Sequence, residues 1–118
     1  IGLIDAVLKP GVDLVIEIVD FAESLVDADL VITGEGRIDI QTIHGKTPVG
    51  VAKIAKSHDI PVICIVGSIG SGIDLFHKMG IDEIYSLIEG DSDLNKALIE
   101  AEYNLTKTAQ NIAKSLNI

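Results

Sequence analysis

The sequence predicts an α/β fold built on a parallel β-sheet, and two observations support this prediction. Three short runs rich in β-branched residues recur along the chain, and the first two are continuously apolar, which is typical of parallel strands covered by helices on both faces. Stretches with a helical spacing of apolar residues separate the runs. The resulting strand–helix–strand–helix–strand order favours right-handed crossover connections within a three-layer sheet.

The predicted strands and helices follow each other closely. We expect strands at residues 29–33, 61–66 and 83–87. A helix is expected at residues 48–57, with Thr47 as its N-cap and proline in its first turn. A second helix is expected at residues 72–79, and Gly80 ends it. Each of these helices would connect two neighbouring parallel strands.

Both ends of the chain are also predicted to be helical. The longest helix is expected from residue 93 to about residue 116, because its apolar residues keep a spacing of three to four. One face of this helix would pack on the sheet and the other would face water. Residues 12–25 contain the run LVIEIV, which a strand would also explain, but the helical spacing of their apolar residues favours a helix. Residues 1–8 are typical of the end of a further helix.

Composition and charge exclude several classes of function. The chain has 118 residues, which fits one domain, and 47% of them are hydrophobic, which is enough for a buried core. Its net charge of -9 would repel a nucleic acid, and no apolar run approaches the ~18 residues that span a bilayer. The single cysteine, Cys64, lies in an apolar run and favours the reducing cytoplasm over secretion.

A parallel sheet of only three strands is small, because sheets of this kind normally have further strands that shield both edges. The chain also starts at Ile1 rather than at a methionine. Both observations favour a portion of a larger domain whose remaining strands lie upstream.

Three predicted loops follow the carboxyl ends of the strands, where open parallel sheets bind their ligands. The first, residues 34–48 with the sequence GEGRIDIQTIHGKTP, ends in Gly-Lys-Thr like a phosphate-binding loop. Ile40, however, stands where that loop requires a glycine, and a β-branched residue does not readily adopt the left-handed backbone that wraps a phosphate. The first loop is therefore not predicted to be a Walker-type loop.

The first loop is nevertheless rich in side chains that suit an anion. A sharp turn is expected around Gly34 and Gly36, and the loop leads to the N-terminus of the helix at residues 48–57. Its charged and polar residues are Glu35, Arg37, Asp39, Gln41, Thr42, His44 and Lys46. Carboxylates beside cations also provide a metal ligand and a base, which phosphoryl transfer needs. The alternative is a plain polar connector in which Arg37 pairs with a neighbouring carboxylate.

The other two loops are weaker candidates. The second, GSIGSG at residues 67–72, could present backbone N–H groups to a phosphate or carboxylate. It lacks the spacing of the dinucleotide fingerprint, and a strand-to-helix turn explains it as well. The third, at residues 88–93, carries acidic residues that could hold a cation, although capping of the following helix accounts for them. Of the histidines, His44 alone lies in the first loop.

The stretch DADLVITGEGRIDIQTIHGKTPVGVAKIAK, residues 27–56, resembles the signature region of bacterial glycerate kinases. The segments LKPGVDLVIEIV (residues 8–19) and IPVICIVGSIG (residues 60–70) are similar to the same family, in the same order. The resemblance implies a two-domain enzyme that transfers the γ-phosphoryl group of ATP, with Mg²⁺, to D-glycerate, and 2-phosphoglycerate is the favoured product. It further implies that residues 1–118 are the C-terminal βαβαβα portion of a Rossmann-like domain, that the inserted second domain is absent, and that the fragment alone is inactive.

The resemblance also implies roles for residues of the first loop. Arg37 and Lys46 would hold the glycerate carboxylate or the transferring phosphoryl group, because both need a positive charge that persists through the transition state. Asp39 would act as general base or as magnesium ligand, and Glu35 would take the other of these roles. The remaining residues would allow close backbone approach or bind substrate hydroxyls; they are Gly34, Gly36, Gln41, Thr42 and Gly45.

A second function stays open at this point: a self-standing α/β module that binds a phosphorylated metabolite without catalysis. An open reading frame that extends upstream of Ile1 favours the enzyme, and a native start at Ile1 favours the module. D-glycerate and ATP are the expected partners of the enzyme, neither nucleic acid nor membrane is expected, and a homodimer stays open.

Overall fold

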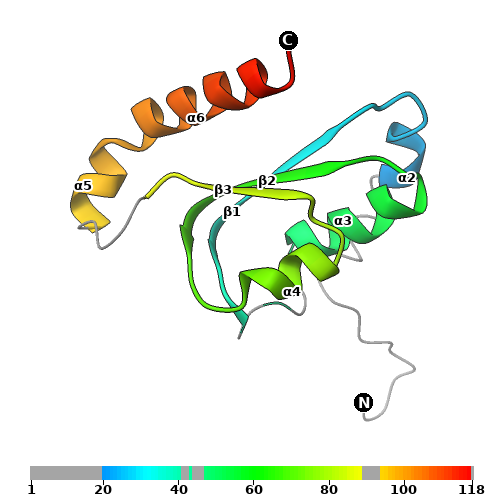
Figure 1. Cartoon of the computed structure of the whole chain (residues 1–118), viewed down its shortest axis with the longest axis horizontal. Coiled ribbons are helices and arrows are strands. Elements are labelled where there is room, and N and C mark those ends of the chain that lie inside the picture. Colours follow the sequence, from blue (N-terminus) through cyan, green and yellow to red (C-terminus); the bar gives the residue numbers. More distant parts are fainter. Residues whose placement is uncertain (1–19, 41–42, 44–46, 89–93, 118) are drawn as a thin grey trace, which may run out of the picture.

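The computed structural model describes residues 20–40, 43, 47–88 and 94–117, and Figure 1 shows how their elements are arranged. In chain order the elements are α2 (Phe21–Ser24), β1 (Val31–Ile38), α3 (Thr47–Ser57), β2 (Val62–Ile69), α4 (Ile73–Lys78), β3 (Glu83–Ser86), α5 (Leu94–Ile99) and α6 (Ala101–Ser115). The alternation of strands and helices that the sequence predicts is therefore present.

The strands form one parallel sheet in the order β1-β2-β3. Val31 lies opposite Val62 in the first pair of strands, and Ile63 lies opposite Glu83 in the second. Figure 1 shows α3 and α4 on one side of the sheet and α6 on the other. The predicted α/β fold with a parallel sheet is confirmed, and the carboxyl ends of β1 and β2 lie side by side.

The core lies between the sheet and the helices α3 and α4. Alternate residues of β2 face this core and are fully buried; they are Val62, Cys64 and Val66. Helix α3 contributes Ala52 and Ala55, whose small side chains allow the helix to lie close to the strands, and α4 contributes Phe76. Complete burial of a side chain such as Phe76 stabilises the fold by roughly 1.5–3 kcal/mol, so this layer holds the sheet and the helices together.

Both β1 and β2 continue further than the sequence predicts. β1 ends at Ile38 and β2 at Ile69, whereas the predicted strands end at residues 33 and 66. The sharp turn expected around Gly34 and Gly36 is therefore wrong, because both glycines lie within β1. Glycine weakens a strand locally, but the two neighbours of Gly36 both pair with β2, and this pairing keeps the segment extended. The extension of β2 also takes in the start of the stretch GSIGSG.

The C-terminal helix differs from its prediction in two ways. It is divided at Glu100 into α5 and α6, and its packing is uneven, since Ile112 is 3% exposed whereas Leu98 is 67% exposed. Glu100 has φ −92° and ψ 2°, although helical hydrogen bonds continue before and after it. The spacing of apolar residues does not reveal this break, because both halves keep the same helical period. Among the described helices, none is both long and apolar enough to pass through a membrane.

The remaining elements differ from the prediction at their ends. Only α2 is helical in the described part of the helix expected at residues 12–25, and residues 1–19 lie outside the described residues. Thr47, expected as the N-cap, is the first residue of α3. Gly72 is the N-cap of α4 with φ 83°, a left-handed conformation that glycine adopts without strain.

Candidate functional site

The candidate site lies at the carboxyl ends of β1 and β2. Arg37, near the end of β1, lies opposite Ser68 of β2 in the strand register, so the two side chains leave the sheet on the same face. Nη1 of Arg37 donates a hydrogen bond of 3.3 Å to the hydroxyl oxygen of Ser68. The pairing of two parallel strands thus places a cation beside a hydroxyl group at the edge where ligands are expected.

Asp39, the first residue after β1, lies close to Arg37. Its Oδ2 is 3.5 Å from Nε of Arg37, and the side chains of Arg37 and Asp39 are 59% and 20% exposed. An ion pair as long and exposed as this contributes about 0–1 kcal/mol to stability, so an anionic ligand could displace the carboxylate from the guanidinium. This ion pair is expected if the first loop is only a polar connector. It also places a cation beside a carboxylate, and phosphoryl transfer needs both. We call Arg37, Asp39 and Ser68 the carboxyl-edge cluster.

Glu35 lies on the face of the sheet that carries the core. It pairs with Val66 of β2, and its Oε1 accepts a hydrogen bond of 3.1 Å from the backbone N–H of Gly36. Burial and, to a smaller extent, the negative charge of Glu35 raise the pKa of the Cys64 thiol to about 11. Cys64 is therefore a neutral core side chain at physiological pH rather than a nucleophile.

Backbone hydrogen bonds continue the pairing beyond the two strands. The N–H of Gly70 donates to the carbonyl oxygen of Ile38 at 2.7 Å, and the N–H of Ile40 donates to the carbonyl oxygen of Ser71 at 2.9 Å. Further along the first loop, Ile43 is 7% exposed and belongs to the core cluster. Residues 38–40 are thus held against the turn after β2, and Ile43 is buried in the core.

Several predicted site residues lie outside the described residues. They are Gln41, Thr42, His44, Gly45 and Lys46, together with most of the third loop at residues 88–93. The predicted roles of these residues stay predictions. Gly34 and Gly36 are described, and a Cβ atom added to Gly36 would meet no atom within 4 Å, so the backbone of β1 is open at this position.

The described part of the chain contains no group of three or more histidine, cysteine, aspartate or glutamate side chains that could hold a metal ion. Magnesium usually takes one or two carboxylates from a protein and completes its shell with water and substrate phosphates. The carboxylates of Glu35 and Asp39 are hard oxygen donors and fit this limited role. Either carboxylate could supply one ligand to such a shell, and the other ligands would come from water and substrate.

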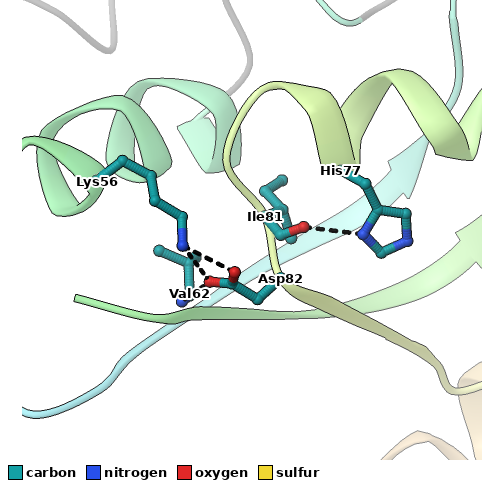
Figure 2. Close-up of polar contacts among 5 residues, drawn as sticks. All are labelled: Lys56, Val62, His77, Ile81 and Asp82. Atoms are coloured by element: carbon teal, nitrogen blue, oxygen red, sulfur yellow. Dashed lines mark hydrogen bonds and ion pairs between the residues drawn. The ribbon is translucent and has the colours of Figure 1, made fainter. Parts of the chain in front are cut away.

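A second charged cluster, which the sequence analysis missed, lies at the opposite edge of the sheet (Figure 2). Lys56, near the end of α3, donates hydrogen bonds of 2.7 and 2.8 Å to the carboxylate of Asp82, which precedes β3. The backbone N–H of Val62, the first residue of β2, donates to the same carboxylate at 2.7 Å. We call Lys56, Val62 and Asp82 the amino-edge cluster. A lysine in a last helical turn and an aspartate before a strand are its only sequence signals.

The contacts of Asp82 change its acidity. Burial alone would raise the pKa of this carboxyl group. The hydrogen bonds from Lys56 and Val62, together with the charges of Lys56 and His77, outweigh burial and lower the pKa below its ordinary value of 3.8. His77 contacts the carbonyl oxygen of Ile81 through Nδ1 at 2.9 Å, just after α4 (Figure 2). This contact suits the packing or capping role that is usual for a histidine at a helix end.

Comparison with known proteins points to one family. A model described as the glycerate kinase family matches residues 1–117. The glycerate kinase of Bacillus subtilis (strain 168) is 50% identical over 115 residues, which cover 98% of this chain and 30% of the relative. The glycerate 2-kinase of Escherichia coli (strain K12) is 41% identical over 117 residues, which cover 99% of this chain and 31% of the relative.

A solved structure is similar in fold as well as in sequence. It is a crystal structure of a protein assigned as glycerate kinase 2 from Salmonella typhimurium LT2, with a TM-score of 0.70 and 45% identity to this chain. The match covers 93% of this chain and 28% of that chain. The chain thus spans about 30% of the length of the relatives it matches.

Proposed function

The chain belongs to the glycerate kinase family, and from this premise we propose that it supplies part of the active site of an ATP-dependent kinase that converts D-glycerate to 2-phosphoglycerate. The carboxyl-edge cluster is the observation that carries the proposal. It brings a guanidinium, a carboxylate and a hydroxyl group together at the edge of a parallel sheet where ligands bind. The name of the Escherichia coli relative, glycerate 2-kinase, supports phosphorylation at the 2-position.

Arg37 binds an anion in this proposal, either the glycerate carboxylate or the transferring phosphoryl group. Its guanidinium carries a charge at every physiological pH, and it offers paired N–H donors that match the oxygens of either group. The side chain is 59% exposed, so a ligand can reach it, while the hydrogen bond to Ser68 orients it. Lys46 would supply a second positive charge to the same anion.

Asp39 is the base in this proposal. The glycerate hydroxyl oxygen attacks the γ-phosphorus of ATP, its proton passes to the carboxylate of Asp39, and the bond from the γ-phosphorus to the bridging oxygen breaks to release ADP. Asp39 is 20% exposed, which permits direct contact with a substrate hydroxyl. Its neighbour Arg37 would stabilise the negative charge that develops on the phosphoryl oxygens.

The remaining predicted residues complete the proposed site. Mg²⁺ would be held by Glu35, with Asp39 as the alternative, and would neutralise the charge of the β- and γ-phosphates. The open backbone at Gly36 supports a close approach of substrate to β1. The other residues proposed to line the substrate are Gly34, Gln41, Thr42 and Gly45.

The proposal includes the arrangement of the longer protein. The relatives are about three times as long as this chain, since the matched residues cover 30% of the Bacillus subtilis protein. We propose that residues 1–118 form the C-terminal portion of a Rossmann-like domain, that an inserted second domain closes the active-site cleft, and that this portion alone is inactive. The neutral, buried Cys64 suits a reducing cytoplasm.

A coupled assay of ADP release tests the proposal. It is run with D-glycerate and MgATP on residues 1–118 and on the protein encoded by the complete reading frame, and ³¹P NMR identifies the product. We expect turnover only in the longer protein, with 2-phosphoglycerate as product. Absence of turnover in both proteins contradicts the kinase, and binding of a phosphorylated metabolite without turnover would establish the binding module in its place. A 3-phosphoglycerate product overturns the assigned position.

A further inference from the structure

The turn after β2 lies unusually close to the residues that follow β1. A Cβ atom added to Gly70 would be 2.5 Å from Cβ of Asp39 and 2.9 Å from Nη2 of Arg37. A Cβ atom added to Gly67 would be 2.5 Å from the carbonyl oxygen of Gly36. These separations are far below an ordinary van der Waals contact, so only glycine fits at either position without movement of its neighbour.

The backbone of Gly70 does not itself require glycine. Among the described glycines, positive φ angles occur at Gly72 and Gly80 and not at Gly70. An alanine could therefore adopt the backbone conformation of residue 70, and the obstacle to a side chain there is the space taken by Arg37 and Asp39. Residue 70 is therefore a glycine because Arg37 and Asp39 leave no room for a side chain, and not because the turn requires a left-handed backbone.

Ser68 contacts Arg37 from the adjacent strand. Its hydroxyl oxygen accepts the hydrogen bond from Nη1 of Arg37, while Gly70 lies beside Nη2 of that guanidinium. Ser71, three residues later, contributes only its backbone carbonyl to the contacts seen among the described residues. Two serines of one short stretch therefore differ in their relation to Arg37.

The same contacts argue against binding of an anion by the backbone N–H groups of the stretch GSIGSG. The backbone N–H of Gly70 already donates to the carbonyl oxygen of Ile38 at 2.7 Å, so it is not available to an anion. Residues 67–69 belong to β2, and Ser68 and Ile69 pair with β1. This stretch therefore holds the end of β1 in place.

We propose that Ser68 and Gly70 are positioning residues that set the guanidinium of Arg37 and the carboxylate of Asp39 in the geometry needed for phosphoryl transfer. The inference rests on the proposed function for its chemistry, and on the Arg37–Ser68 hydrogen bond and the absent side chain at residue 70 for its geometry. Ser68 and Gly70 act through Arg37 and Asp39 and do not touch the substrate.

The test uses four variants of the full-length protein: Gly70→Ala, Ser68→Ala, Ser68→Thr and the matched control Ser71→Ala. A displacement of reacting groups by about 1 Å can lower the rate about 100-fold, so Gly70→Ala is expected to lower kcat by about that factor. Ser68→Ala is expected to raise the KM for D-glycerate about tenfold, because a hydrogen bond to a charged group is lost. Ser68→Thr restores most of this loss, Ser71→Ala changes neither constant, and circular dichroism reports folding throughout.

The outcomes separate positioning from structure. If Ser68→Ala behaves like Ser71→Ala, or if Ser68→Thr fails to restore the KM, the role of Ser68 is overturned. If Gly70→Ala keeps the wild-type kcat while folded, the role of Gly70 is overturned. A Gly70→Ala protein that fails to fold assigns Gly70 to the fold rather than to positioning, and Ser68→Ala, which adds no atom at residue 70, then tests the inference.

A second measurement does not depend on kinase activity. The ¹H–¹⁵N signal of the Arg37 Nε–H group, identified by its absence in Arg37→Lys, is recorded for the full-length wild type and for each variant. We expect Ser68→Ala and Gly70→Ala to shift or broaden this signal and Ser71→Ala to leave it in place. An unchanged signal in both variants overturns the inference even if the protein is a kinase, and a changed signal upholds the geometry even if the wild type does not phosphorylate glycerate.

Discussion

The charged clusters at the two edges of the sheet differ in how closely their carboxylates are held. At the amino edge, the carboxylate of Asp82 accepts three hydrogen bonds of 2.7–2.8 Å from Lys56 and Val62. At the carboxyl edge, the carboxylate of Asp39 is 3.5 Å from the guanidinium of Arg37. Three short, convergent hydrogen bonds fix the carboxylate of Asp82 in place, whereas the long contact with Asp39 leaves the exposed guanidinium of Arg37 within reach of an anion.

This difference separates stability from function in one small sheet. The amino-edge cluster joins the end of α3, the start of β2 and the residue before β3, so its contacts tie together three segments of the fold. The carboxyl-edge cluster joins the ends of two strands that already pair along their length, so its contacts add little to stability. We therefore expect substitutions at the carboxyl edge to impair activity and substitutions at the amino edge to impair stability.

The largest effect is expected from Asp39→Asn in the full-length protein. Loss of a general base lowers turnover by about 100-fold or more, while the amide keeps the size of the side chain and leaves the KM for D-glycerate nearly unchanged. The coupled ADP-release assay measures both constants. Asp59→Asn, at an exposed position beyond α3, is the matched control and should behave as the wild type. Near-normal turnover in Asp39→Asn would remove Asp39 as the base.

Arg37→Ala is expected to have a smaller effect of a different kind. Removal of the charge that holds an anion should raise the KM for D-glycerate about 10- to 100-fold, because hydrogen bonds to charged groups contribute strongly to binding. The thermal unfolding midpoint should stay within a degree or two of the wild type, since exposed ion pairs contribute little to stability. Lys107→Ala, an exposed cation on α6, is the control. An unchanged KM for glycerate would move Arg37 to the nucleotide or to a structural role.

Lys56→Met tests the other edge. It keeps much of the aliphatic stem but removes both hydrogen bonds to Asp82, and we expect a loss of about 1 kcal/mol, because the two side chains are partly exposed. The unfolding midpoint of the full-length protein should fall by a few degrees, with kcat and KM unchanged. Lys53→Met, on the same helix and also exposed, should not move the midpoint. A loss of activity without a loss of stability would break the proposed division between the two edges.

The smallest expected effect is the pH dependence of the same contact. The pKa of Asp82 in the folded protein is lower than its ordinary value of 3.8, so folding is favoured by the ionised carboxylate. The stabilisation is complete above this ordinary value and is lost as the pH falls through the lowered folded pKa. The difference in unfolding midpoint between wild type and Lys56→Met should therefore be constant near neutral pH and shrink below about pH 4. A difference that grows on acidification would contradict the assignment.

The sequence predicts the starts of the strands better than their ends. Predicted strands begin at residues 29, 61 and 83, and the observed strands begin at Val31, Val62 and Glu83. Apolar, β-branched runs mark the buried beginnings of β1 and β2, because burial acts on each residue locally. The end of β1 contains glycine and charged residues and the end of β2 contains a glycine, all of low strand propensity. These residues are extended only because a neighbouring strand supplies hydrogen-bond partners.

The candidate site also has one part that the sequence predicts and another part that only the structure reveals. Arg37 and Asp39 are two residues apart, so a pattern of charges in one loop suffices to predict that they act together. Ser68 and Gly70 are about thirty residues away, and only the register of β1 against β2 brings them to the same place. The contact of Lys56 with Asp82 has the same origin, since β2 and α4 lie between the two residues in the chain.

The sequence by itself determined the class of fold, the order of its elements, the family, and the loop in which charged residues concentrate. These properties follow from apolar runs, helical spacing and a continuous motif, all of which are read within short windows of the chain. The tertiary structure alone decided how far β1 and β2 extend, which side chains support Arg37 and Asp39, and which edge of the sheet carries the tight cluster. The physical reason is that these features depend on hydrogen bonds and contacts between segments far apart in sequence, and the pairing of parallel strands sets their positions.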